Sequence, residues 1–282
     1  MIYISLCALP DRIELRESFS QCINALINQN TELDYKILVN IPNKFINYEE
    51  ANISEWFLEL CNNTPKIQII RDDIDYGPIS NILYPLKHVS MSDDDILIVC
   101  DDDHLYHEDL IRYHVHKLNQ YPENHCICFR GNDPREMRTW YNSNNKKIGK
   151  LYPSCVLFPT RHDIYLRFPD HWHSVSYRKK LLKEDIFDQE FLDMTWNNDI
   201  LMGYYGWTHN FYFLCANYGG ETDYRPVNND GKGSHSFPIV KPLPNHSNSG
   251  CNRWRAKPST DIWTNSKFTQ GMAIDKGEII LS

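Results

Sequence analysis

The sequence predicts an α/β fold with a mostly parallel central sheet flanked by helices. In the first half of the chain, short apolar runs alternate with segments of helical periodicity, which is the pattern of βαβ units. The run Ile96–Cys100 is continuously apolar, as expected of a strand that is buried on both faces. A chain of 282 residues is long enough for one large domain of this class.

Local patterns define the expected elements in order. Strands are expected where apolar and β-branched residues run together, and helices where apolar residues recur three or four positions apart. The expected strands are 2–9, 35–41, 67–71, 96–100, 126–129, 154–158 and 211–215. The expected helices are 13–28, 50–61, 78–88, 107–120 and 189–204. Residues 219–250 are rich in Gly, Pro, Asn and Ser and predict an extended loop or tail.

The helix at 107–120 follows an acidic triplet, Asp101–Asp103. Tyr121–Pro122 ends this helix. His114 and His116 are two residues apart on it, so they point to different sides, and we expect both at the surface. The triplet therefore lies on a loop between a strand and a helix, where ligands of open α/β sheets bind.

Composition narrows the classes of function. Hydrophobic residues make up 41% of the chain and charged residues 23%, which is ordinary for a globular protein. The net charge of -8 argues against a nucleic-acid partner, because phosphate neutralisation needs clustered Lys and Arg. A phosphate-bearing ligand would need a local cation such as a metal ion.

The chain carries no signals for secretion or membrane insertion. The N-terminal run 2–9 lacks the charged start and cleavage site of a signal peptide, and no apolar stretch approaches the roughly 18 residues of a membrane span. Nine cysteines without paired Cys-x-x-Cys spacing favour a reducing compartment. We expect a cytoplasmic protein without a membrane span, in the host cytoplasm if it is viral.

The triplet Asp101–Asp102–Asp103 predicts a divalent metal site. Two carboxylates about 4 Å apart repel by roughly 4 kcal/mol at an effective dielectric near 20, and a divalent ion reverses this penalty. In an extended chain Asp101 and Asp103 point to the same side, with Cα atoms roughly 6.6 Å apart, while Asp102 points elsewhere. Such ligands suit Mn²⁺ or Mg²⁺ with a diphosphate completing the shell. The alternative is a solvated acidic turn at the start of a helix.

These motifs resemble those of GT-A glycosyltransferases. The resemblance rests on the strand, helix and strand at the N-terminus, on Asp75-Tyr-Gly-Pro78, and on the apolar strand that delivers the Asp-x-Asp motif at Asp101–Asp103. It covers roughly residues 1–215 and is nearest to short forms of bacteria and large DNA viruses. It implies a Rossmann-like GT-A fold with an irregular C-terminal acceptor-side region. It also implies a nucleotide-sugar donor, with UDP favoured, a glycan acceptor, and Mn²⁺ or Mg²⁺.

The resemblance also implies roles for individual residues. Asp199 would be the general base, and Asp101, Asp103 and His235 would hold the metal, with His246 as the competitor of His235. The residues implied to contact the donor are Arg12, Asp73, Asp75, Asp101, Asp102 and Lys232. Two simpler readings stay open, namely an exposed helix-start residue for Arg12 and an exposed helix-face residue for Asp199.

The resemblance further implies an organisation and a reaction. Residues 1–125 would form the half that binds the nucleotide-sugar, and 126–240 the acceptor-binding and catalytic half of the same domain. Residues 241–282 would be a C-terminal tail. With Asp199 as a base, transfer would invert the anomeric configuration. A sugar nucleotidyltransferase and a non-catalytic carbohydrate-binding module remain the alternatives, because fold alone does not decide function.

Overall fold

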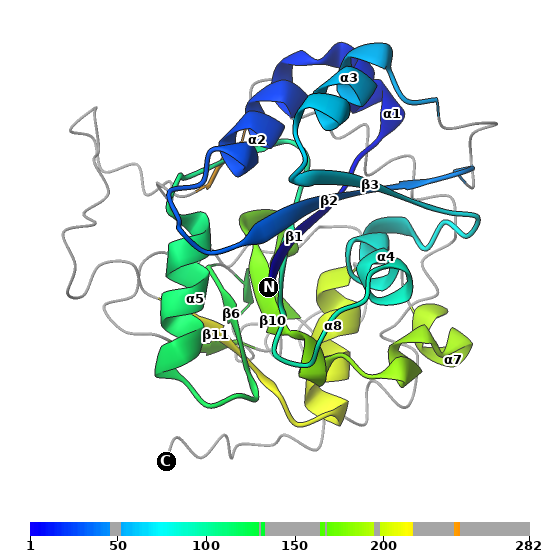
Figure 1. The fold of residues 1–282 in the computed structure, drawn as a ribbon. Helices are drawn as coiled ribbons and strands as arrows, with labels where there is room; N and C mark the ends of the chain where they lie inside the picture. The colour runs from blue at the N-terminus through cyan, green and yellow to red at the C-terminus, as the bar shows by residue number, and fades with distance from the viewer. Residues whose placement is uncertain are drawn as a thin grey trace, which may run out of the picture.

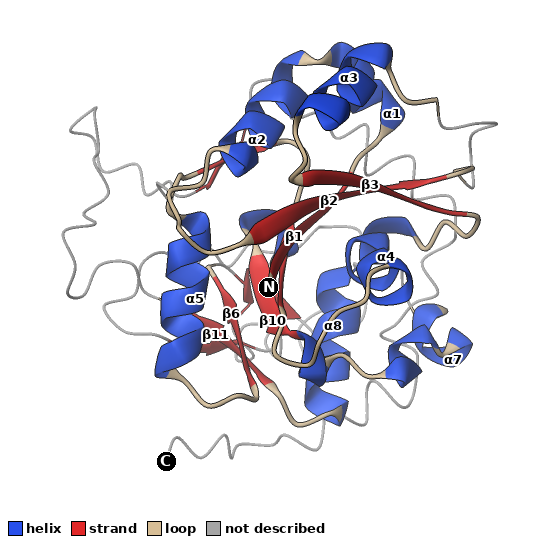
Figure 2. Cartoon of the chain, in the orientation of Figure 1, coloured by secondary structure: helices blue, strands red, loops and turns tan. Residues whose placement is uncertain are grey.

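The computed structural model describes residues 1–45, 52–129, 131–132, 164–166, 168–194, 198–216 and 240–242. Within these ranges the chain forms a large central sheet with helices on both faces (Figure 2). This confirms the predicted α/β class with a mostly parallel sheet flanked by helices. The expected strand at 154–158 lies outside the described residues.

The central sheet has the strand order β3-β2-β1-β4-β10-β6-β11-β8. Its strands are β1 (Ile2–Cys7), β2 (Tyr35–Pro42), β3 (Ile67–Asp72), β4 (Ile96–Cys100), β6 (His125–Cys128), β8 (Ile164–Leu166), β10 (Val175–Arg178) and β11 (Tyr212–Cys215). The neighbours from β3 to β4 are parallel, as are β6 and β11, whereas β10 and β8 run antiparallel to their neighbours. The carboxyl ends of β1 and β4 therefore meet at one edge of the sheet.

Short strands form two further pairs. β5 (His104–Tyr106) pairs antiparallel with β12 (Val240–Pro242), and β7 (Gly131–Asn132) pairs antiparallel with β9 (Phe168–Pro169). The β5–β12 pair joins a late segment of the chain to the strand that directly follows the acidic triplet.

Two layers of helices bury the two faces of the sheet (Figure 1). Along β1, Ile4 and Leu6 enter one apolar core and Tyr3 enters the other, as the alternation of a strand requires. The first core includes residues of α1 (Pro10–Leu15), α2 (Glu17–Ile27), α3 (Glu55–Asn63) and α5 (Leu110–Gln120). The second includes residues of α4 (Ser80–His88), α7 (Gln189–Leu192) and α8 (Asn198–Thr208). Short 3-10 turns are η1 (Gly77–Ile79), η2 (His171–His173), η3 (Lys179–Leu181) and η4 (Glu184–Phe187).

Several boundaries differ from the sequence prediction. The expected helix 13–28 is two helices, α1 and α2, because Arg16 between them has a φ of 58°. The expected helix 189–204 is likewise divided into α7 and α8, and residues 195–197 between them are not described. β5 stands between the acidic triplet and α5, where only a loop was expected.

Helix α4 continues through Pro85, as the apolar pattern predicts. Proline has no N–H, so the carbonyl of Asn81 one turn earlier lacks its usual intrahelical donor. The buried hydroxyl of Ser5 donates to this carbonyl at 2.5 Å. Strand β1 therefore supplies the hydrogen bond that Pro85 removes.

His114 is a correction to the sequence analysis. It was expected at the surface, but its side chain is fully buried. Its Nδ1 lies 2.9 Å from Ser176 Oγ and its Nε2 lies 2.8 Å from Ser174 Oγ, which ties α5 to β10. Strand β10 was not predicted, so the sequence offered no buried partners for this imidazole.

None of the helices in the described part of the chain combines the length and the apolar character that crossing a membrane requires.

Candidate active site

The acidic triplet lies at the carboxyl edge of the parallel strands. Leu6 of β1 and Cys100 of β4 are register partners, so the residues that follow both strands leave the sheet side by side. Asp101 comes directly after β4. The turn at Asp102 and Asp103 then leads into β5. This is the edge at which ligands of open α/β sheets bind.

The turn brings together three side chains that could hold a metal ion. Ligand atoms of Asp101, Asp103 and His104 all lie within 4.8 Å of one another. Nδ1 of His104, which is fully buried, lies 2.7 Å from Asp103 Oδ1. The convergence of Asp101 and Asp103 agrees with the geometric expectation. His104 was not predicted as a ligand, because side chains alternate along an extended chain and His104 would point away from Asp101 and Asp103. The observed turn removes that alternation.

Arg12 is the cationic partner of this loop. It forms a short ion pair with Asp102 Oδ1, and its Nη1 lies 3.1 Å from Asp103 Oδ2. The backbone N–H of Leu9 donates to Asp102 Oδ2 at 3.3 Å. Burial alone would lower the pKa of Arg12, but Asp102 and Asp103 outweigh it and raise that pKa. Leu9 and Arg12, which follow β1, thus fix the position of Asp102.

The electrostatics of the triplet favour a cation. Burial, followed by repulsion from Asp103 and Asp102, raises the pKa of Asp101 well above its ordinary value. Burial is also the main cause that raises the pKa of Asp102 to about 6, against the opposing effect of Arg12. Three carboxylates, of which Asp102 and Asp103 are buried and Asp101 is partly buried, therefore share one nearby guanidinium. A divalent cation would supply the missing positive charge, and hard oxygen ligands with one imidazole fit Mn²⁺ or Mg²⁺.

Asp199, the predicted general base, acts electrostatically on the triplet. It is in the first turn of α8, and its charge is among the causes that raise the pKa of Asp101. Its Oδ1 accepts hydrogen bonds from the backbone N–H of His171 at 3.0 Å and from His171 Nδ1 at 2.6 Å. Nε2 of His171 lies 2.6 Å from Tyr177 Oη. The sequence indicated Asp199 but gave no sign of His171.

The predicted donor-binding residues Asp73 and Asp75 follow β3. Asp73 Oδ1 accepts a hydrogen bond from Asn43 Nδ2 at 2.7 Å, and Asp75 Oδ1 accepts one from the backbone N–H of Gly77 at 2.8 Å. Asp75 and the acidic triplet both influence the partly buried thiol of Cys7 at the end of β1. Its pKa is raised by burial and then by Asp75, Asp102 and Asp101, so these carboxylates surround the end of β1.

Two predicted residues cannot be located. Lys232 and His235 lie outside the described residues, as does His246. The described strand β12 falls between His235 and His246 in the sequence, and its Pro242 is the register partner of His104. Strand β12 therefore lies beside β5, the strand that follows the acidic triplet.

Fold and site together define a glycosyltransferase domain of the GT-A class. The chain belongs to glycosyl transferase family 2, whose sequence profile matches residues 14–188, more than half of its length. No curated protein sequence matches the chain.

Of three similar solved structures, the first supports the fold. A TarS structure from S. aureus matches 78% of this chain and 35% of its own length, with 12% identity and a TM-score of 0.50. TarS 1–349 from the same organism matches with 10% identity and a TM-score of 0.47, over 75% of this chain and 59% of its own length. GalNAc-T7 with UDP, GalNAc and Mn²⁺ matches with 11% identity and a TM-score of 0.49, over 97% of this chain and 55% of its own length. The chain thus spans between about a third and three fifths of these structures.

Proposed function

We propose that the protein transfers a sugar from a nucleoside-diphosphate donor to an acceptor hydroxyl, with inversion at the anomeric carbon. The observation that carries the proposal is the convergence of Asp101, Asp103 and His104 at the carboxyl edge, with Asp199 close enough to act on Asp101. Metal ligands and a candidate base beside one another are what such a transfer requires.

In this proposal Asp101, Asp103 and His104 hold a divalent cation, Mn²⁺ or Mg²⁺. When bound, the cation would supply positive charge that stabilises the leaving nucleoside diphosphate. Asp73 and Asp75 contact the base and ribose of the donor, for which UDP is the favoured nucleotide. Arg12 and Asp102, which pair with each other, keep the acidic loop in place against the donor.

Asp199 accepts the proton of the acceptor hydroxyl. The acceptor oxygen forms a bond to the anomeric carbon while the bond from that carbon to the diphosphate oxygen breaks, and its electron pair leaves with the nucleoside diphosphate. Attack opposite to the leaving group inverts the configuration. A carboxylate needs only hydrogen-bond reach to serve as this base.

Residues 1–125 would supply the donor side in this scheme, and residues 126–240 the acceptor side. Lys232 is proposed as a further contact to the diphosphate, and His235 or its competitor His246 as a further ligand of the metal. The tail 241–282 has no assigned role in transfer.

Thermal unfolding tests the donor site. The protein is melted with a panel of nucleoside diphosphates, each with and without Mn²⁺. A ligand at about 100 times its dissociation constant adds roughly 2.7 kcal/mol, which raises the melting temperature by a few degrees. The proposal expects a shift that requires both Mn²⁺ and one nucleotide, and that Asp103→Asn abolishes. Nucleotide binding that ignores the metal and Asp103 would contradict it.

The rate of sugar transfer by variants of Asp199 and Asp103 tests the chemical step. Asp199→Asn should keep the metal-dependent shift but lose sugar transfer, whereas Asp103→Asn should lose both. A protein that binds glycans but shows no metal-dependent nucleotide binding would instead be a carbohydrate-binding module. Release of pyrophosphate from a nucleoside triphosphate would identify a nucleotidyltransferase.

A further inference from the structure

We infer that His171 is a positioning residue that orients Asp199 for proton transfer, with Tyr177 fixing the imidazole. This inference rests on the proposed role of Asp199 as the general base. His171 is 1% exposed and supplies two donors, its backbone N–H and Nδ1, to the same carboxylate oxygen. Because both the backbone and the side chain of His171 donate to the carboxylate of Asp199, rotation of that carboxylate is restricted.

The contact also defines the protonation of the imidazole. An ionised carboxylate can only accept hydrogen bonds, so Nδ1 of His171 must carry a proton. In the neutral ring Nε2 is then an acceptor, and the hydroxyl of Tyr177 donates to it at 2.6 Å. Burial raises the pKa of Tyr177 well above its ordinary value, so the hydroxyl keeps the proton that it donates.

The chain of contacts links the proposed base to β4, the strand that the acidic triplet directly follows. Tyr177 is on β10 and is the register partner of Leu97 on β4, which ends one residue before Asp101. Tyr177 holds His171, and His171 holds Asp199. The distance between base and metal ligands is therefore set by the rigid centre of the sheet and not by the start of α8 alone.

One oxygen of Asp199 remains available for chemistry. The side chain of Asp199 is 25% exposed. Both contacts from His171 reach Oδ1, and Oδ2 has no hydrogen-bond partner among the residues that the structure describes. The charged and titratable groups that face Asp199 include His171, Tyr177 behind it, and Asp101 of the acidic triplet. Because His171 holds Oδ1, Oδ2 is the oxygen that can accept a hydrogen bond from an acceptor hydroxyl.

His171→Leu and His171→Asn form the test pair. Leucine removes the side-chain donor, whereas asparagine keeps an N–H at the position of Nδ1. His171→Leu should lower kcat about 100-fold, which is the effect of a misplaced catalytic group, while the donor KM changes less than about 2-fold. Because N–H donors stabilise the carboxylate form, the acidic limb of the kcat profile should also move to higher pH. His171→Asn should restore most of kcat and the position of that limb.

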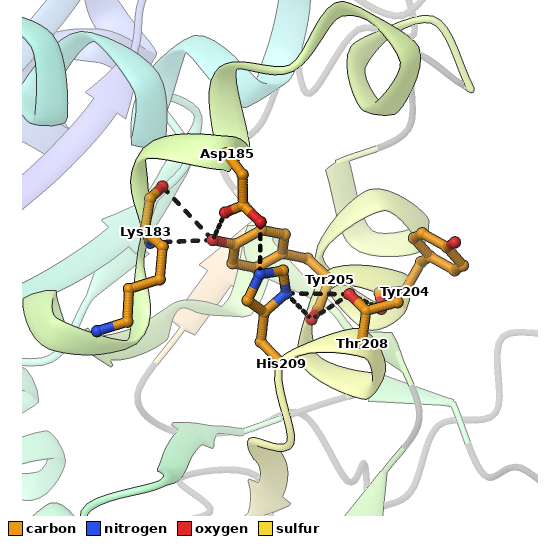
Figure 3. Close-up of polar contacts among 6 residues, drawn as sticks. All are labelled: Lys183, Asp185, Tyr204, Tyr205, Thr208 and His209. Carbon is orange, nitrogen blue, oxygen red and sulfur yellow. Dashed lines mark hydrogen bonds and ion pairs between the residues drawn. The ribbon is translucent and has the colours of Figure 1, made fainter.

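The control is a second His–Asp pair, His209 and Asp185, which lies at the opposite end of α8 from Asp199 (Figure 3). His209, just past the end of α8, lies 2.8 Å from Asp185 through its Nε2 and stacks on Tyr205. His209→Leu removes a similar contact at the opposite end of the helix. It should lower the melting temperature without changing kcat per folded molecule or the pH profile.

The outcomes distinguish a failure of the proposed function from a failure of the proposed role of His171. If Asp199→Asn keeps full turnover, the proposed function loses its base and the role of His171 falls with it. If Asp199→Asn is inactive but His171→Leu keeps the wild-type kcat and pH profile, only the role of His171 is overturned. Equal losses of kcat in His171→Leu, His171→Asn and His209→Leu, in proportion to the unfolded fraction, would mark His171 as merely structural.

Discussion

Nη1 of Arg12 lies 3.1 Å from Oδ2 of Asp103, and the same nitrogen also pairs with Asp102. Breaking a buried ion pair on one side leaves an uncompensated charge and costs about 3–5 kcal/mol. We therefore expect Arg12→Met to lower the free energy of unfolding by about that amount when metal is chelated. Denaturant titration in the presence of a chelator measures this loss.

Added Mn²⁺ should stabilise Arg12→Met more than the wild type, because the cation replaces part of the missing positive charge. Arg112→Met is the matched control. Arg112 is half exposed and pairs with Asp109 at 3.0 Å, so its loss should change stability by less than about 1 kcal/mol. Similar losses in both variants, or equal stabilisation by Mn²⁺ of Arg12→Met and the wild type, would contradict this account of the loop.

The direction of β12 distinguishes the two candidate histidines of the C-terminal part. The chain leaves β12 at Pro242, opposite His104, and enters it at Val240, opposite Tyr106. The acidic triplet directly precedes His104, so a segment that follows Pro242 starts nearer to the triplet than one that precedes Val240.

His246 follows Pro242 by four residues, a stretch that spans at most about 14 Å, whereas His235 precedes Val240 by five. We expect His246→Ala to weaken Mn²⁺ binding about 10-fold or more and His235→Ala to weaken it less, although the family resemblance favours His235. Calorimetric titration with Mn²⁺ measures both. The reverse order would restore His235 as the ligand, and no effect in either would leave the described side chains as the protein ligands.

The sequence predicts those parts of the fold that depend on local pattern. β4 was predicted at its observed bounds because a run of five consecutive apolar residues is typical of a strand that is buried on both faces. β10 was not predicted, because Val175–Arg178 is short and its burial comes from antiparallel insertion between β4 and β6. Its insertion also covers His114, which shares the buried side of α5 with Ile111 and Leu118.

In the candidate site too, contacts within one loop could be predicted from the sequence, whereas contacts between distant segments could not. Asp101 and Asp103 are two residues apart, so geometry within one loop sufficed to predict that they converge. The contacts of Arg12 with Asp102 and of His171 with Asp199 join residues 90 and 28 positions apart. No spacing rule links such pairs, because the sheet order decides which loops meet.

Tyr205 connects the end of α8 to the turn η4 (Figure 3). Its buried hydroxyl accepts from the backbone N–H of Lys183 at 2.9 Å and donates to Asp185 at 2.9 Å. Tyr205→Phe leaves the ring packing intact but removes both hydrogen bonds. We expect a loss of about 1–2 kcal/mol in the free energy of unfolding.

Tyr212→Phe is the control for this loss. Tyr212 is half exposed, and its ring contacts with His125 and Tyr165 are kept by phenylalanine. Chemical denaturation should show a change within about 0.5 kcal/mol for this variant. If Tyr205→Phe is as stable as Tyr212→Phe, the hydroxyl contributes nothing to the attachment of α8.

His114 should make the protein sensitive to acid. Burial lowers its pKa from 6.5 to about 3, so between these values the unfolded chain binds a proton that the folded protein does not. The contribution is fully present above pH 6.5 and is lost as the pH falls toward 3, by about 1.4 kcal/mol per pH unit. His114→Gln cannot take up this proton, and its slope of unfolding free energy against pH between 6 and 4 should be flatter by about that amount.

His116→Gln is the control for the acid sensitivity, because His116 is on the same helix and exposed. Its replacement should leave the slope unchanged, even if both variants differ from the wild type in stability at pH 7. Urea titrations at half-unit steps from pH 7 to 4 give the slopes directly. Parallel slopes for His114→Gln and the wild type would mean that the acid sensitivity arises elsewhere, and that the imidazole of His114 binds its proton equally in the folded and unfolded states over this range.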